Sequence, residues 1–238
     1  MQRLMSCMRS AIERYNMIEN GDKICVGVSG GKDSVALLCA LSDMRRFLPI
    51  DFKLYAVSIN MNFDGVPTDF SEIAELCHRL GVPYTIKDTR IGEIIFDVRK
   101  EANPCSLCSR MRRGALHDAT KELGCNKIAL GHHLDDAVET FYINLLQGGA
   151  INCFSPVTYL SRKDITMIRP MIYAYEKDVI RAVNSRNLPI CKSTCKADGN
   201  TERQRVKELL LGLEENYENL RKKTLTALQN AEINGWHN

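Results

Sequence analysis

The 238-residue sequence has no long hydrophobic run, few aromatic residues and little excess of charge of either sign. A helix that crosses a bilayer needs about 18 or more consecutive apolar residues, so the sequence excludes a membrane-spanning helix and we expect no membrane partner. The N-terminal residues, MQRLMS, lack the apolar core of a secretory signal peptide, and we therefore expect a cytoplasmic protein. Aromatic residues make up 7%, which is low for a surface that stacks on unpaired bases. The net charge of +3 permits a nucleic-acid partner without indicating one.

What the sequence does contain is a globular composition, 45% apolar and 26% charged, in which strand and helix patterns alternate. Short β-rich apolar runs predict buried strands, and apolar residues at helical spacing predict helices. The predicted strands cover 23–29, 52–60, 84–88, 126–130 and 165–169, and the predicted helices cover 3–19, 35–44, 69–80, 110–123, 134–146, 176–186 and the charged segment 201–230.

This alternation predicts an α/β fold with an open, parallel, five-stranded, doubly wound sheet and helical N- and C-terminal extensions. We expect an N-terminal helix in residues 1–20 and a central α/β domain over 21–188. The remaining residues, 189–238, are expected to form a cysteine segment and helices that pack on the same domain.

The most informative loop is SGGKDS, residues 29–34, which joins the first predicted strand to a helix. Open α/β sheets bind ligands at the carboxyl ends of their strands, where this loop lies. Glycines let the backbone approach a ligand, and the next helix presents free N–H groups to an anion such as a phosphate, although the spacing is not that of a Walker A motif. Lys32 adds positive charge, and Asp33 is explained if it holds Mg²⁺. The candidate phosphate-binding residues are Ser29, Gly30, Gly31, Lys32, Asp33 and Ser34.

Ten cysteines are many for a chain without an export signal, and in a reducing compartment they are thiols, metal ligands or catalytic groups. Two clusters stand out, Cys105-x-x-Cys108 and Cys191-x-x-x-Cys195. Two thiolates at the first spacing can share a metal centre, but spacing alone does not separate a four-cysteine zinc site from an iron–sulfur cluster. The other six are predicted to be mostly buried small apolar side chains, namely Cys7, Cys25, Cys39, Cys77, Cys125 and Cys153.

A stretch rich in histidine and acidic residues, GHHLDDAVET at 131–140, follows the fourth predicted strand. With a helix that begins near Leu134, Asp135 and Glu139 lie one turn apart on one face. Acidic residues also suit the N-terminal dipole of a helix, which explains Asp135 better than Glu139. Basic residues flank the two cysteine clusters, either as solvated helix faces or as a guide for RNA phosphates. They are Arg110, Arg112 and Arg113 beside the first cluster, and Lys192, Lys196, Arg203, Arg205 and Lys207 around the second.

Four motifs in a fixed order give the sequence a family resemblance. SGGKDS resembles the PP-loop of the N-type ATP pyrophosphatases, which adenylate a substrate and release pyrophosphate. PCSLC and the arginines after it, GHHLDDAVET, and the RPMI and EKD strings at 169–172 and 176–178 resemble motifs of the tRNA 2-thiolation enzymes in that family. The set extends from about residue 23 to about residue 210 and is most similar to the tRNA 2-thiocytidine synthetase (TtcA) group. The related TtuA group, which makes 2-thiouridine, usually has zinc fingers at both ends, and here no CxxC precedes SGGKDS.

The resemblance implies a PP-loop fold of the adenine nucleotide alpha hydrolase type, with ATP, Mg²⁺ and a [4Fe–4S] cluster as cofactors. It implies that Cys105, Cys108 and Cys195 hold the cluster and leave one iron open for sulfur. Cys195 is favoured because Asn200 and Arg203 follow it at the family's spacing. The C-x3-C spacing departs from the family's C-x2-C, which leaves Cys191 as the alternative ligand.

The resemblance also implies roles around the ATP pocket. Gly131 and His132 would close the pocket. The implied catalytic residues are Lys32, which would stabilise charge on the phosphates, and Asp33 and Asp136, which would bind Mg²⁺ or manage protons.

We therefore expect an ATP-dependent tRNA sulfurtransferase that adenylates a pyrimidine C2 oxygen and replaces it with sulfur, with cytidine in the anticodon loop as the implied target. Its expected partners are tRNA, a sulfur donor (sulfide or a cysteine desulfurase) and a second copy in a homodimer. The alternatives are a 2-thiouridine synthetase of the TtuA type, a lysidine-synthetase-like ligase, a desulfurising relative, and a non-catalytic ATP-binding scaffold with a four-cysteine zinc site.

Overall fold

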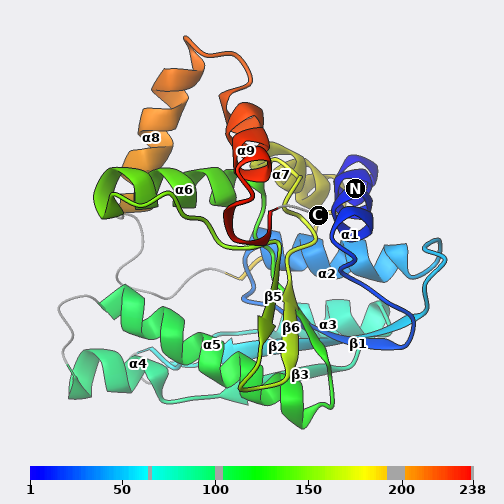
Figure 1. Ribbon diagram of the computed structural model, residues 1–238. Helices are drawn as coiled ribbons and strands as arrows, with labels where there is room; N and C mark the ends of the chain where they lie inside the picture. Colours follow the sequence, from blue (N-terminus) through cyan, green and yellow to red (C-terminus); the bar gives the residue numbers. More distant parts are fainter. Residues whose placement is uncertain (64–65, 100–103, 192–201, 237–238) are drawn as a thin grey trace.

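The computed structural model describes residues 1–63, 66–99, 104–191 and 202–236, which form a sheet with helices on both faces (Figure 1). Six strands lie in the order β3-β2-β1-β4-β6-β5. Neighbouring strands are parallel except for β5 and β6, which pair antiparallel. The strands are β1 (Asp22–Gly27), β2 (Phe52–Asn60), β3 (Tyr84–Asp88), β4 (Lys127–Ala129), β5 (Val157–Leu160) and β6 (Ile165–Ile168).

Helices make the crossovers between the parallel strands and extend the fold at both ends. The crossover helices are α2 (Lys32–Met44), α3 (Ser71–Arg79), α4 (Ile91–Glu93), the π-helical turn Ile94–Val98, α5 (Pro104–Glu122) and α6 (Leu134–Gly148). The others are α1 (Gln2–Arg14), α7 (Glu176–Ser185), α8 (Glu202–Glu214), α9 (Leu220–Asn230) and the 3-10 turn Ile233–Gly235. No helix in the described part of the chain is both long enough and apolar enough to cross a membrane.

The two faces of the sheet bury separate apolar cores. Along β1, Ile24 and Val26 point into the core that includes α1, α2 and α7, whereas Cys25 between them points to the other face. That second core includes Leu116 and Ala119 of α5. Because side chains alternate across a strand, a continuous apolar run such as that of β1 must be covered on both faces.

Several elements differ from the sequence prediction, and two of these differences bear on the sheet and the cavity. The sheet has six strands instead of five, because Val157–Leu160 forms β5, an antiparallel hairpin partner of β6 at the edge of the sheet. This strand is short and only partly buried, so it carries no strong apolar signal. The helix predicted for 110–123 begins earlier, at Pro104, so Cys105 and Cys108 lie in its first turns. Proline is tolerated at the start of a helix because the first N–H groups have no intrahelical acceptor.

The six scattered cysteines follow their prediction. Cys25, Cys39, Cys77, Cys125 and Cys153 are buried, and Cys7 is half-buried. Burial raises the pKa of the Cys25 thiol to about 12 and that of the Cys39 thiol to about 11, which keeps these thiols protonated and unreactive.

Candidate active site

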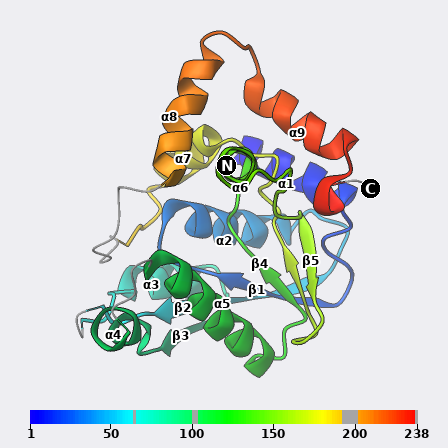
Figure 2. The same ribbon diagram turned by 60° about the vertical axis from the view of Figure 1, so that its left-hand side comes forward.

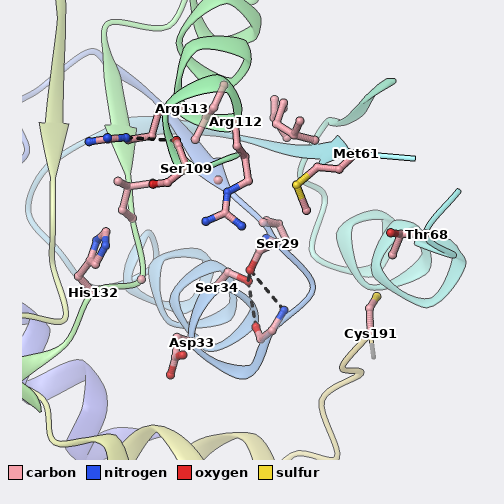
Figure 3. Close-up of a pocket in the computed structure, with 18 of the residues that line it drawn as sticks. Ser29, Asp33, Ser34, Met61, Thr68, Ser109, Arg112, Arg113, His132 and Cys191 are labelled. Carbon is pink, nitrogen blue, oxygen red and sulfur yellow. Dashed lines mark hydrogen bonds between the residues drawn. The ribbon is translucent and has the colours of Figure 1, made fainter. Parts of the chain in front are cut away.

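A cavity of about 480 Å³ opens at the carboxyl ends of β1, β2 and β4 (Figure 3). Loop 29–34 forms one wall, the first turns of α5 form another, and the loop that leads into α6 forms a third. This is the edge at which parallel α/β sheets bind ligands. Of the predicted site residues, the cavity is lined by Ser29, Gly31, Asp33, Ser34, Gly131, His132 and Asp136.

Hydrogen bonds between its own residues hold loop 29–34 in a tight turn. The Ser34 hydroxyl donates to the Gly31 carbonyl at 2.9 Å and accepts the Ser29 N–H at 3.2 Å. Gly31 is the N-cap of α2 and makes no side-chain cap, so the first N–H groups of that helix are available to an anion.

Gly30 and Gly131 permit close packing that a side chain would block. Gly30 has φ +85°, and a Cβ there would lie 2.7 Å from the Cβ of Cys191. A Cβ on Gly131 would lie 3.0 Å from the carbonyl carbon of Asp33. The two loops that line the cavity are therefore packed backbone against backbone.

Lys32 does not line the cavity, whereas Asp33, the other charged residue of loop 29–34, does. Its ammonium group lies 3.2 Å from Asp33 Oδ2 and 3.1 Å from Glu176 Oε1. Asp33 Oδ1 is buried and has no hydrogen-bond partner in the described part of the chain. An unpaired carboxylate oxygen at a phosphate-binding cavity suits a divalent cation such as Mg²⁺.

His132 lines the cavity as a neutral imidazole. Burial, and to a smaller extent the nearby charge of Arg169, lower its pKa to about 4. Its ring packs against Phe154, with 5.1 Å between the centroids, and the Arg169 guanidinium lies over the same phenyl ring, 4.9 Å from its centroid. The Nδ1 atom of His132 is buried and has no hydrogen-bond partner among the described residues.

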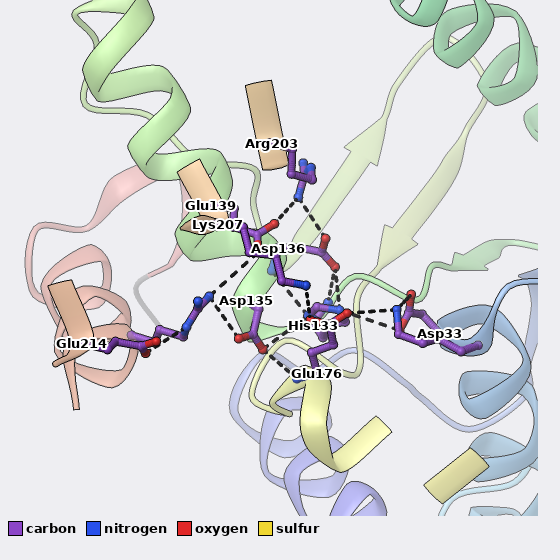
Figure 4. Close-up of polar contacts among 11 residues, drawn as sticks. Asp33, His133, Asp135, Asp136, Glu139, Glu176, Arg203, Lys207 and Glu214 are labelled. Atoms are coloured by element: carbon purple, nitrogen blue, oxygen red, sulfur yellow. Dashed lines mark hydrogen bonds and ion pairs between the residues drawn. The ribbon is translucent and has the colours of Figure 1, made fainter. Parts of the chain in front are cut away.

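The acidic residues that start α6 have separate roles. Asp136 and His133 form a capping box, in which His133 Nδ1 accepts the Asp136 N–H and Asp136 Oδ2 accepts the His133 N–H. Asp135 and Glu139 lie on one face and are buried against Arg221 of α9, at 3.1 and 3.9 Å. These two carboxylates therefore attach the C-terminal helices, and only Asp136 of the three lines the cavity (Figure 4).

The cysteine clusters reach the cavity through the residues that the structure describes. The Cys108 thiol lies 3.6 Å from the sulfur of Met61, a residue of the cavity wall. Cys191 lines the cavity itself, and its backbone N–H donates to the Gly30 carbonyl at 2.9 Å. Cys195 and the side chain of Cys105 lie outside the described residues. One described thiol of each cluster therefore lies at or beside the cavity wall, and thiolates are the donors that an iron–sulfur cluster needs.

α5 contributes the positive charge of the cavity. The Arg112 guanidinium projects into the cavity toward Ser29, whereas Arg113 turns back and donates from Nε to the Ser109 carbonyl at 3.3 Å (Figure 3). Arg110 is exposed and does not line the cavity.

Sequence reasoning missed several residues of the site. Met61, Phe63 and Thr68 line the cavity but come from a segment without any recognisable pattern, and Phe70 lies at the start of a predicted helix that carries no sign of a site. In the sequence, Glu176 stands out only as part of the EKD string at 176–178, which is the available signal for it. Arg221 carried no local signal, because its partners are about 80 residues away in the sequence.

The chain matches one protein-family model and is similar to known relatives over most of its length. The model of the PP-loop domain family matches residues 4–213. A tRNA-cytidine(32) 2-sulfurtransferase of Pelobacter propionicus is 38% identical over 96% of this chain and 86% of its own length, and that of Aliivibrio fischeri (strain MJ11) is 39% identical over 93% and 72%.

Solved structures show the same fold. The U34-tRNA thiolase NcsA from Methanococcus maripaludis, determined with its [4Fe-4S] cluster, has a TM-score of 0.75 at 24% identity, over 91% of this chain and 74% of that one. The NH3-dependent NAD synthetase from Campylobacter jejuni has a TM-score of 0.51 at 16% identity, over 93% and 87%.

Proposed function

Because the chain belongs to the PP-loop domain family, we propose that it is an ATP-dependent tRNA sulfurtransferase that replaces the C2 oxygen of a cytidine with sulfur. Relatives at 38–39% identity are named for cytidine 32, and we propose that nucleotide as the target. One observation carries the proposal: the phosphate-binding loop, the loop before α6, an arginine of α5 and a cysteine of the second cluster all line one cavity.

In the first half of the proposed reaction, the cytidine C2 oxygen attacks the α-phosphorus of ATP and pyrophosphate leaves. The free N–H groups at the start of α2 would bind the phosphates, and Lys32, the first residue of that helix, would offset part of their charge from outside the cavity lining. Asp33 and Asp136 would hold the Mg²⁺ that accompanies ATP, since both line the cavity and Asp33 keeps an unpaired oxygen.

In the second half, a sulfur nucleophile bonds to C2 and AMP leaves with the original oxygen. Cys105, Cys108 and Cys195 would hold a [4Fe–4S] cluster whose open iron supplies that sulfur. The position of Cys108 next to Met61 in the cavity wall supports a thiolate centre near the reacting base. Sulfide or a cysteine desulfurase is proposed as the sulfur source.

Two neighbouring side chains have proposed roles in holding the base. His132 is neutral at physiological pH and its unpaired Nδ1 can exchange a hydrogen bond with a polar edge of cytosine. Arg112 projects toward Ser29 and would contact the phosphate or the activated base. A base exposed from a loop fits such a cavity, because an RNA helix hides its base edges.

Two further parts of the proposal concern the compartment and the oligomeric state of the protein. The tRNA substrate and the ten cysteines both suit the reducing cytoplasm. A homodimer is proposed from the family resemblance.

The decisive experiment compares Cys108→Ala with Cys7→Ala, a change at a half-buried cysteine of α1, a helix that does not line the cavity. Both proteins are purified without oxygen, assayed for iron and inorganic sulfide, and incubated with tRNA, ATP and sulfide. We expect C108A to bind ATP within about twofold of the wild type but to form no 2-thiocytidine, because it lacks a cluster ligand. C7A should retain thiolation. Thiolation by C108A, or bound zinc without sulfide in the wild type, would contradict the proposal.

Mass spectrometry of tRNA nucleosides from cells that lack the gene identifies the substrate. Loss of 2-thiocytidine is the expected result. Loss of 2-thiouridine instead would assign the enzyme to the other thiolation chemistry, and an unchanged profile would refute the sulfurtransferase.

A further inference from the structure

Glu176, the first residue of α7, has a half-buried carboxylate, and the reaction outlined above gives it no role. Its backbone N–H donates to Asp135 Oδ2 at 2.7 Å, and Asp135 is itself held by Arg221 at 3.1 Å. The Glu176 side chain is 23% exposed and extends toward loop 29–34 (Figure 4). The backbone of Glu176 is therefore fixed to α6 and α9, and its carboxylate is aimed at the phosphate-binding loop.

Two lysines share that carboxylate. Glu176 Oε1 lies 3.1 Å from Lys32 Nζ, and Oε2 lies 2.7 Å from Lys207 Nζ on α8. Burial by itself would raise the pKa of Glu176, but hydrogen bonds from Lys207 and Lys32 lower it to about 2. The carboxylate is thus charged throughout the pH range in which enzymes of this kind work.

Lys32 contacts the carboxylates of Glu176 and of its sequence neighbour Asp33 at the same time. The Lys32 ammonium lies between Glu176 Oε1 and Asp33 Oδ2, at 3.1 and 3.2 Å. Asp33 Oδ1 remains buried without a hydrogen bond among the described residues, and His133 Nε2, at 3.7 Å, is too far to donate to it. If Glu176 carried no charge, Asp33 would be the remaining anion beside Lys32, and both of its oxygens would be drawn to the ammonium group.

We propose that Glu176 is a positioning residue that holds Lys32 on Oδ2 of Asp33 and thereby keeps Oδ1 unpaired among the described residues, as a ligand for the divalent cation that enters with ATP. Lys207 fixes the orientation of Glu176 from the opposite oxygen. The inference rests on the proposed function only in taking the cavity to bind a metal–ATP complex, and it does not depend on sulfur transfer.

The test measures binding of Mn²⁺, as a paramagnetic substitute for Mg²⁺, to the full chain in the presence of ATP by electron paramagnetic resonance. Glu176→Gln keeps the size of the side chain and removes its charge. We expect E176Q to weaken Mn²⁺–ATP binding about tenfold, since hydrogen bonds between charged groups contribute on that order. Binding of ATP in the presence of EDTA should change less than twofold, because the phosphate-binding N–H groups are unaltered.

Glu208→Gln is the matched control. Glu208 lies on α8 and its carboxylate accepts a hydrogen bond from Gln204 at the exposed surface. E208Q should bind Mn²⁺–ATP like the wild type. In a Lys32→Gln background, E176Q should cause no further loss, because the lysine that Glu176 positions is then absent.

Circular dichroism establishes whether each variant is folded. If E176Q does not fold, Glu176→Asp replaces it as the test variant. E176D keeps the charge and the backbone contact but shortens the reach to Lys32, so an intermediate affinity is expected. Wild-type affinity in the folded E176Q, an equal loss of metal-free ATP binding, or a further loss in the Lys32→Gln background would overturn the inference. A wild-type chain that binds Mn²⁺–ATP but forms no thiolated base would refute the proposed function and leave this inference standing.

Discussion

Two adjacent glycines in the phosphate-binding loop have different reasons for being glycine. Gly30 has φ +85° and its α-carbon packs against Cys191, so a side chain there is excluded by the backbone conformation and by contact. Gly31 has φ −76° and ψ 159°, which other residues adopt, and a Cβ there would lie 3.6 Å from Ser29 Oγ, an ordinary contact. The sequence shows both residues alike, and only the folded backbone distinguishes them.

This difference predicts opposite effects of the same substitution. Gly30→Ala should lower the free energy of unfolding by at least about 2 kcal/mol, because a left-handed conformation and a close contact are both penalised. Gly31→Ala should leave stability unchanged or raise it by up to about 1 kcal/mol, because it reduces the freedom of the unfolded chain. Urea denaturation of the nucleotide-free proteins measures both. Equal losses in the two variants would show that Gly30 does not have the strained environment described here.

At the scale of elements, a buried ion-pair network attaches the C-terminal helices to α6. Arg221 of α9 is 6% exposed and contacts Asp135 at 3.1 Å and Glu214 of α8 at 2.9 Å. Arg203 of α8 adds contacts to Asp136 at 2.9 Å and to Glu139 at 3.2 Å. The acidic residues of the 131–140 motif therefore serve two surfaces, the cavity and the docked helices.

The network predicts a large cost for removing its buried cation. Arg221→Ala should lower the free energy of unfolding by about 3 kcal/mol, because Asp135 would remain buried without its arginine partner and Glu139 would keep only Arg203. Lys222→Ala, the next residue of α9, is exposed and should change stability by less than about 0.5 kcal/mol. Thermal and urea unfolding give both values. A small effect of R221A would mean that α9 is held by apolar packing alone.

The local patterns of the sequence predicted most elements but not all of their limits. Apolar runs and glycine turns predict β1 to β4, β6 and the crossover helices α2, α3 and α6, since those signals lie within a few residues, but α4 and the π-helical turn Ile94–Val98 are not predicted. The edge strand β5 is not predicted because it is short and half-exposed. The predicted helix 110–123 begins later than the observed α5, whose first turn begins at a proline. The charged segment 201–230 forms two helices, α8 and α9, which its composition does not reveal.

At the scale of the whole molecule, the last described turn of the chain packs against the end of the N-terminal helix α1. In Figure 2 the last turn of the chain lies beside α1. The Tyr15 hydroxyl donates to the Trp236 carbonyl at 3.1 Å, and the Trp236 indole N–H donates to the Phe154 carbonyl at 3.0 Å. Trp236 is fully buried and is the only tryptophan of the sequence, so its fluorescence reports on this closure. Phe154 also packs on His132, which connects the closure to the cavity.

The neutral His132 predicts how global stability depends on pH. Its pKa is lowered to about 4 in the folded protein, chiefly by burial, whereas an unfolded histidine titrates near 6.5. Between these values the unfolded chain binds more protons, so stability is full above about pH 6.5 and falls as the pH drops toward about 4, by at most about 1.4 kcal/mol per pH unit for this residue. The lowered pKa of His117 acts in the same direction.

Urea unfolding followed by Trp236 fluorescence and far-ultraviolet circular dichroism tests this dependence from pH 7 to 4. His132→Gln should reduce the slope and leave the part that His117 contributes. Coincident transitions by the two probes would support the expectation that the C-terminal helices unfold with the central α/β domain. An unchanged slope in H132Q would show that His132 is not neutral in the folded protein.

The sequence by itself determined the succession of strands and helices, the phosphate-binding loop and the family, because each depends on residues close together in the chain. Only the tertiary structure decided that Lys32 meets Glu176, that Arg221 meets Asp135, and that Cys191 packs on Gly30. The partners in each of these pairs are far apart in sequence, and they meet only because the crossovers and the docked helices bring them together. The ion pairs then compensate charge, and the close approach of Cys191 leaves no space for a side chain on Gly30. Neither effect leaves a local pattern, so the chemistry of the cavity wall follows from the fold.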